Sequence, residues 1–242
     1  MKIKAVRPLA KADAPDEFHE LVAQRFKSYA SPGTELVVVC LDDAPPNIGP
    51  WMGHASEARI EAMAPYMVQE AVKAEKEGFD GIYFPCDWNA GAEIARHFVN
   101  IPLIDTGPAA LHAAALVGSR ICMLIMEDSC KPYARNLLKR WGMSHFVTSI
   151  KAWNIPIHQH RDSGAEIKKR TIKLSKEAIE EEDAEVILPF GALYVPTMVP
   201  VEEIQKEVSV PIINQVAIGV KMTEMFVNLK MRHSSKAYPA VI

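Results

Sequence analysis

The chain has 242 residues, of which 49% are hydrophobic and 24% are charged, and its formal net charge is -3 at pH 7. This balance is typical of a globular protein, and it excludes the basic surface that nucleic acid or an anionic membrane would require. No apolar run reaches the roughly 18 residues of a membrane-spanning helix. Residues 1–6 are too few for a signal-peptide core, because Arg7 and Pro8 interrupt the apolar pattern. We therefore expect a cytoplasmic protein whose partner is a small molecule; association into a homo-oligomer stays open.

Short apolar runs alternate with helical patterns along the chain. After a first strand at the N-terminus, further strands are expected at residues 35–40, 81–84, 121–125, 185–188 and 211–213. Helical periodicity is found at residues 56–77, 90–98, 132–141, 165–182 and 216–231. The strand runs are continuously apolar, which indicates parallel strands covered on both faces. Their alternation with helices predicts an α/β fold with mainly parallel sheets.

Two segments of the sequence look like copies of one another. Residues 79–86 and 184–191 are both apolar runs that end just after a proline, and each leads through a helix to a second apolar run. We interpret them as equivalent strands of two pseudo-symmetric half-domains that face each other across a cleft. The expected halves are residues 1–105, completed by 215–242, and residues 106–214. Because ligands bind beyond the carboxyl ends of parallel strands, Cys86 and Gly191 mark the expected site.

The cysteines show neither C-x-x-C pairs nor zinc-like spacing with histidines, so no metal, cofactor or disulfide framework is predicted. Cys86 stands out because it ends a predicted buried strand and precedes a predicted helix. The positive end of that helix would favour the thiolate, which could act as a nucleophile or a base. The alternative is an inert packing residue. The polar Asp87 and Asn89 favour chemistry, since they could orient the thiol or bind substrate.

The stretch Gly78-Phe79-Asp80-Gly81-Ile82-Tyr83-Phe84-Pro85-Cys86-Asp87 resembles the first cysteine motif of the hydantoin racemase branch of the aspartate/glutamate/hydantoin racemases. Further similar motifs occur in the family's order, upstream at residues 32–35 and 49–50 and downstream at residues 118–121, 184–187 and 210–213, so the resemblance covers nearly the whole chain. It implies cofactor-independent proton abstraction at a carbon α to a carbonyl. It also implies two opposed thiols, one removing the α-hydrogen and the other returning a proton to the opposite face.

The second thiol implied by the resemblance is missing from this sequence. Gly191 stands at the best-aligned position, or Phe190 if the prolines of the two motifs are paired. One interpretation is that Tyr194, Asp128 or Cys130 supplies the second acid–base group. Another is a one-thiol reaction, such as that of the related arylmalonate decarboxylases, or another lyase or hydrolase reaction. A third is a binding protein that has lost catalysis.

Two further positions depart from the family pattern. Arg7 begins the sequence Arg7-Pro8-Leu9, where the family has an Asn-Pro-Asn signature. Its guanidinium could hold a substrate carboxylate with two parallel hydrogen bonds, or it could be a solvated surface group. Ile125-Met126 replaces a threonine pair, which removes two hydroxyl donors and favours a less polar substrate or a different pose.

The histidines give weaker indications. His54 lies in a glycine-containing loop and could contact substrate, although a surface or capping role is the alternative. His158 and His160 have the spacing of a strand-borne metal pair, but no third ligand follows at a suitable distance. The sequence thus predicts a racemase-like isomerase that acts on a small amino-acid-, hydantoin- or carboxylate-type substrate without a metal or cofactor.

Overall fold

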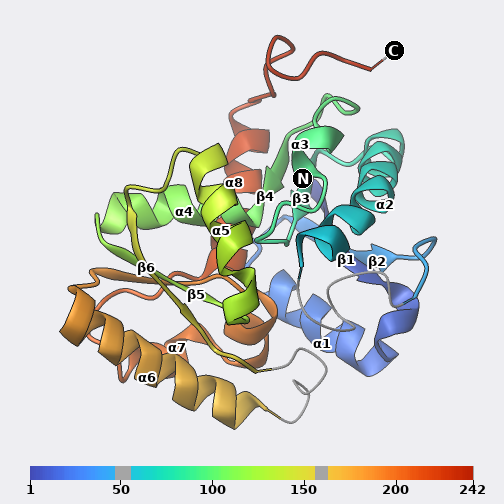
Figure 1. Cartoon of the computed structure of the whole chain (residues 1–242). Helices are drawn as coiled ribbons and strands as arrows, with labels where there is room; N and C mark the ends of the chain where they lie inside the picture. The colour runs from blue at the N-terminus through green and yellow to red at the C-terminus, as the bar shows by residue number, and fades with distance from the viewer. Residues whose placement is uncertain (47–55, 156–162, 242) are drawn as a thin grey trace. The chain divides into compact units, whose positions relative to one another are not determined.

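The computed structural model describes residues 1–46, 56–155 and 163–241, so His54, His158 and His160 lie outside the described residues. The chain divides into two compact units. The first unit contains β1 (Lys2–Ala10), a 3-10 turn (Lys11–Asp13), α1 (Asp16–Lys27), β2 (Glu35–Leu41), α2 (Glu57–Lys76), β3 (Gly81–Phe84), α3 (Ala92–Ala95), β4 (Leu103–Asp105) and α8 (Gln215–Asn228). These elements are labelled in Figure 1.

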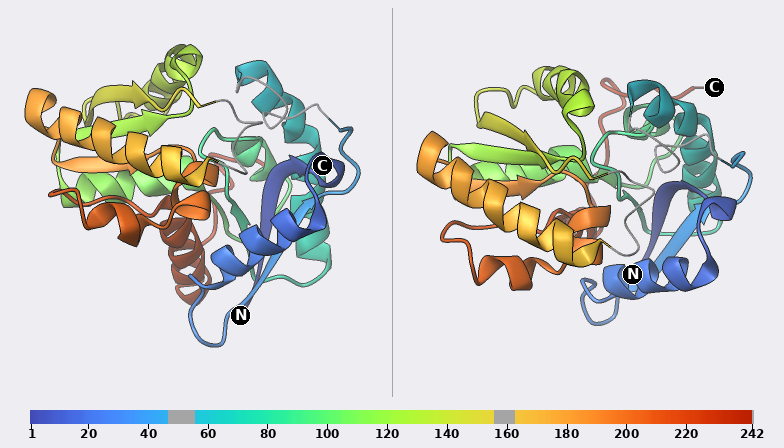
Figure 2. Two further views of the ribbon diagram at one scale, coloured as in Figure 1. Left: turned by 90° about the horizontal axis from the view of Figure 1, so that it is seen from below. Right: turned by 60° about the horizontal axis from the view of Figure 1, so that its bottom comes forward.

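The sheet of the first unit has the strand order β2-β1-β3-β4, and all its neighbouring strands are parallel. Ala5, in the central strand β1, pairs with Val38 of β2 and with Tyr83 of β3. Because the strands run in one direction, their carboxyl ends lie at one edge of the sheet. Helix α1 packs against β2 (Figure 2) through the face that carries Phe18, Val22 and Phe26.

Helix α8 completes the first unit although it lies far from the other elements in sequence. Gly219 approaches Tyr83 so closely that a Cβ at this position would lie 2.2 Å from the ring atom Cε2. Further along the helix, the carboxylate of Glu224 accepts hydrogen bonds from the backbone N–H and the hydroxyl of Ser31, both at 2.7 Å. Close packing and these bonds therefore fix α8 to the unit that carries Cys86.

The second unit has a parallel sheet with the strand order β6-β5-β7. Its elements are α4 (Thr106–Val117), β5 (Ile121–Ile125), α5 (Lys131–Arg140), β6 (Val147–Ala152), α6 (Gly164–Glu182), β7 (Val186–Pro189), a π-helical segment (Leu193–Met198) and α7 (Val201–Gln205). The central strand β5 is buried along its whole length. Helix α6 packs against β5 and β6 and contacts α7, as Figure 1 shows.

The predicted α/β class with parallel sheets is confirmed. The expected strand at residues 211–213 is reduced to an isolated bridge between Ile187 and Ile212. The expected helix at residues 90–98 is also shorter, because α3 spans only Ala92–Ala95. Helix α1 was not predicted, nor was the half-exposed strand β6, which lacks a continuous apolar run. Within the described part of the chain, no helix is long and apolar enough to cross a membrane.

Candidate functional site

Cys86 lies just beyond the carboxyl end of β3, in a loop that is buried throughout. Its own exposed fraction is 4%, and Asp87, Trp88 and Asn89 are equally hidden. The loop turns sharply, since Asn89 and Gly91 have positive φ angles of 57° and 75°. This turn brings the backbone N–H groups of Trp88 and Ala90 to the sulfur of Cys86. The local fold thus supplies hydrogen-bond donors for a thiolate.

Burial nevertheless raises the pKa of the Cys86 thiol to about 12, because removal from water disfavours the charged form. The backbone N–H of Ala90 opposes this shift, and the negative charge of Asp87 adds to it. The net shift is thus opposite to the direction expected from a helix N-terminus alone, and the helix that follows, α3, spans only four residues. Without a ligand, Cys86 is a protonated thiol at neutral pH.

Asn89, three residues after Cys86 in the same buried loop, carries an unused acceptor. Its Oδ1 atom is buried and has no hydrogen-bond partner among the described residues. A buried polar atom without a partner costs about 1–3 kcal/mol, so a ligand that donates a hydrogen bond would recover this free energy. The predicted role of Asn89 in substrate binding is compatible with this geometry.

Behind the loop, a hydrogen-bonded cluster holds the ends of β3 and β4 in place. The hydroxyl of Thr106 donates to the carbonyl oxygen of Phe84 at 3.1 Å and lies 2.9 Å from the Tyr83 hydroxyl. Arg96 forms an ion pair with the buried Asp105. These residues were not predicted; the only signal in the sequence was their position at the ends of apolar runs. They support the backbone that positions Cys86.

Arg7 is buried in β1, with 6% of its surface exposed, and is therefore not a solvated surface arginine. Its Nη1 atom lies 3.1 Å from Nδ1 of His19 and 3.4 Å from Sγ of Cys40. Burial lowers the pKa of this guanidinium. Arg7 lines a pocket of about 220 Å³ together with Lys11, His19 and Cys40, at the end of the sheet where Cys86 follows β3. Sequence reasoning missed His19 and Cys40, which lie on α1 and β2.

In the second unit, the position expected for the second thiol is packed against an aromatic ring. A Cβ at Gly191 would lie 3.0 Å from Cζ3 of Trp153. Trp153 is 1% exposed, and its indole N–H donates to the Thr171 hydroxyl at 2.8 Å. Phe190, the alternative position, is itself buried. Gly191 thus stands where the second thiol was expected, and the ring of Trp153 packs against it.

The candidates for a second acid–base group lie in different environments. Tyr194 is buried, its hydroxyl donates to the carbonyl oxygen of Ile155 at 2.6 Å, and burial raises the pKa of the phenol. Asp128 is largely exposed and pairs with Lys131 at 2.6 Å, which lowers the pKa of its carboxyl. Cys130 is buried at the start of α5, and burial raises the pKa of its thiol. The structure therefore gives Tyr194 and Asp128 partners within the second unit.

A metal centre finds no support in the part of the chain that the structure describes. No group of three or more His, Cys, Asp or Glu side chains within it could hold a metal ion. The chemistry available at the described site is that of side-chain thiol, amide and guanidinium groups.

Comparison with known proteins shows a family relationship that extends over most of the chain. Residues 14–223 match the Asp/Glu/Hydantoin racemase family. The chain is 25% identical to a hydantoin racemase from Pseudomonas sp. (strain NS671), over 97% of this chain and 89% of that protein. The structure is similar to allantoin racemase from Klebsiella pneumoniae, with a TM-score of 0.85, 22% identity, and coverage of 100% of this chain and 95% of the other.

A more distant structural likeness is to arylmalonate decarboxylase, with a TM-score of 0.60, 15% identity, and coverage of 94% of this chain and 92% of the other. At these identities the structural matches show the fold, whereas the family match covers most of the sequence. The chain therefore belongs to the Asp/Glu/hydantoin racemase family and is an enzyme of the racemase type.

Proposed function

We propose that this protein is a cofactor-independent racemase or isomerase that acts at a carbon α to a carbonyl, with Cys86 as its acid–base thiol. The observation that carries the proposal is the surroundings of Cys86. A buried thiol follows a parallel strand, two backbone N–H groups reach its sulfur, and a buried amide oxygen of the same loop lacks a partner among the described residues. Such a loop can hold a thiolate and a hydrogen-bond donor of a substrate together.

The proposed proton transfer follows from this arrangement. An α-hydrogen becomes acidic because the adjacent carbonyl delocalises the carbanion. The small fraction of Cys86 that is present as thiolate removes that hydrogen, and the N–H groups of Trp88 and Ala90 stabilise the negative charge on the sulfur before the transfer. In the reverse direction the neutral thiol returns the proton. Asn89 Oδ1 is placed to accept a hydrogen bond from a substrate N–H, and Asp87 stays a candidate for orienting the thiol.

The substrate class is proposed from the relatives and from the unused acceptor. The relatives named above are a hydantoin racemase and an allantoin racemase. A hydantoin ring carries an N–H donor on the nitrogen bonded to its α-carbon, which suits the acceptor of Asn89. We therefore place hydantoin-type cyclic amides first, followed by N-substituted amino acids and other small carboxylates.

A one-sided reaction is the alternative. It is favoured by Gly191, because this residue offers no acid–base group and the Trp153 ring lies against it. An enzyme with one thiol can exchange or replace a group on one face of a planar carbanion without inverting the centre. A decarboxylase or other lyase of the same fold would work in this way.

Deuterium exchange tests both versions. Wild-type protein would be incubated in deuterated buffer with single enantiomers of hydantoins, amino acids and substituted malonates, and followed by proton NMR and chiral chromatography. Exchange together with racemisation supports the racemase. Exchange without racemisation, or loss of carbon dioxide from malonates, supports the one-sided reaction.

Variants connect this activity to the proposed thiol. Cys86→Ala should abolish exchange, whereas the matched change Cys122→Ala, at a buried thiol within β5, should leave it unchanged. Retention of full activity in both Cys86→Ala and Cys86→Ser would refute the assignment of Cys86.

A further inference from the structure

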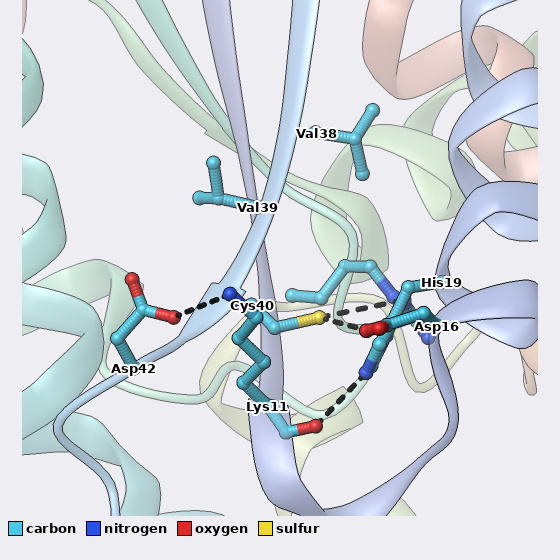
Figure 3. A pocket seen from close by; sticks show the side chains of 8 residues that line it. Lys11, Asp16, His19, Val38, Val39, Cys40 and Asp42 are labelled. Carbon is cyan, nitrogen blue, oxygen red and sulfur yellow. Dashed lines mark hydrogen bonds and ion pairs between the residues drawn. The ribbon is translucent and has the colours of Figure 1, made fainter.

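The pocket next to Arg7 contains a second thiol centre that the proposed function does not use. It is built within the first unit from β1, the following 3-10 turn, α1 and β2, and its volume is about 220 Å³. Figure 3 shows Cys40, at the end of β2, beside His19 and Asp16, which come from α1. Cationic, thiol and imidazole groups therefore meet in one small cavity.

Arg7 provides the reason to expect an anion in this cavity. Its guanidinium is more than nine-tenths buried. Nη1 is the only atom of the group that has hydrogen-bond partners in the described residues, and no carboxylate there pairs with it. The Nε and Nη2 donors form the edge that binds a carboxylate with two parallel hydrogen bonds. A buried charge without a counterion is costly, so an anion entering the pocket would be stabilised.

The pairing of His19 and Cys40 gives the pocket a nucleophile beside a base. Nε2 of His19 lies 3.0 Å from the carbonyl oxygen of Lys11, which can only accept a hydrogen bond. Nε2 therefore carries the hydrogen, and the single lone pair of Nδ1 is shared between Nη1 of Arg7, 3.1 Å away, and Sγ of Cys40, 3.3 Å away. A thiol next to an imidazole that a third group orients is the arrangement of an activated cysteine. Burial raises the pKa of the Cys40 thiol, and the Arg7 donor on the sulfur opposes this shift.

The charges around the cavity restrict the ligand. Lys11 pairs with Asp42 at 3.7 Å, and Asp16 also lines the pocket. The carboxylates of Asp16 and Asp42 balance the cations of Arg7 and Lys11 in the lining, which disfavours a ligand with two negative charges and favours one that also carries an N–H donor. We propose that the pocket binds a small monocarboxylate with an amino or amide N–H group, and that Cys40 and His19 form a reactive pair beside it. This inference goes beyond the proposed function because it involves no step at Cys86.

Alkylation with a charged and a neutral reagent tests the pocket without any substrate. Iodoacetate and iodoacetamide place the same reactive carbon on an anion and on a neutral amide. In each case the sulfur of Cys40 forms a bond to that carbon, iodide leaves, and the thiol proton passes to Nδ1 of His19. The rate at Cys40 would be followed by mass spectrometry of its peptide, with glutathione as the reference thiol. We expect the rate ratio of iodoacetate to iodoacetamide to exceed that of glutathione by about tenfold or more.

Matched variants separate recognition from general reactivity. Arg7→Gln should abolish the preference for iodoacetate, whereas Lys27→Gln, which removes an exposed positive charge from α1, should preserve it. His19→Gln should slow both reagents, because the thiol loses its base.

A protection experiment on the wild-type protein keeps the test valid if Arg7→Gln does not fold. Alanine should protect Cys40 from iodoacetamide, and alaninamide, which lacks the carboxylate, should not. Equal protection by both compounds, or a reagent ratio equal to that of glutathione, would overturn the carboxylate site. A Cys40 that reacts with neither reagent would overturn the reactive pair.

Discussion

Gly191 lies against the indole ring of Trp153, so closely that a Cβ at Gly191 would be 3.0 Å from Cζ3. The ring is buried and is held by a hydrogen bond from its N–H to Thr171. The position expected for the second thiol is therefore closely packed by the neighbouring segment. A Gly191→Cys change alone would leave too little space for the added side chain, because the Trp153 ring would stay in place.

The first prediction concerns this contact. Gly191→Cys should destabilise the protein by about 1–3 kcal/mol, because the added side chain overpacks a buried site. Gly191→Cys combined with Trp153→Phe should cost less than the sum of the two single changes, since the smaller ring relieves the contact. Urea unfolding of the four proteins measures the coupling. Strictly additive free energies would show that the ring does not restrict Gly191.

The second prediction concerns Tyr194. Tyr194→Phe should lower the free energy of unfolding by about 1–3 kcal/mol, because the carbonyl oxygen of Ile155 loses a buried donor at 2.6 Å. If this is the only role of the hydroxyl, α-hydrogen exchange should remain near the wild-type rate at a temperature where the variant is folded. Retained exchange with lost racemisation would instead identify Tyr194 as the second acid–base group. Chiral chromatography beside NMR exchange distinguishes the two outcomes.

Much of the first unit could be predicted because its signals are local. Residues 81–84 are continuously apolar and form a buried parallel strand, and the polar loop after them places Cys86 at its carboxyl end. The family resemblance also depends on short contiguous motifs. Such features can be predicted from sequence because residues that are neighbours in the sequence are also neighbours in the strand and its loop.

The remaining features depend on contacts between distant segments. His19 meets Cys40 only because α1 packs on β2, and α1 itself was not predicted. Trp153 reaches Gly191 because β6 and β7 flank β5 in one sheet, an order that the sequence does not display. The direction of the Cys86 pKa shift depends on how completely the loop is buried. The expected position of Cys86 before a helix suggested a lowered pKa instead.

The third prediction uses that pKa shift. The pKa of Cys86 is raised from an ordinary value of 9.0 to about 12, so the folded state disfavours the thiolate. Below about pH 9 neither state is ionised and the thiol has no pH-dependent effect on stability. Between about pH 9 and pH 12 the unfolded state loses its proton first, and the wild type should therefore lose stability with rising pH.

Cys86→Ala lacks this ionisation, so its unfolding free energy should fall less steeply over the measurable range of pH 9 to about 11. Urea unfolding at a series of pH values gives the two curves. Parallel curves would show that the Cys86 thiol titrates alike in both states, contrary to its burial.

The last prediction concerns the attachment of α8. Gly219→Ala should be strongly destabilising, by about 3 kcal/mol or more, because its Cβ would lie 2.2 Å from the Tyr83 ring. The ring cannot move aside easily, since it is fully buried and its hydroxyl lies 2.9 Å from that of Thr106. Gly164→Ala is the matched control, since a Cβ there, at the start of α6, meets no atom of the described residues within 4 Å. It should be neutral or slightly stabilising, as expected for alanine in a helix. Thermal unfolding compares the two changes; similar melting temperatures for both would mean that α8 does not depend on its close approach to β3.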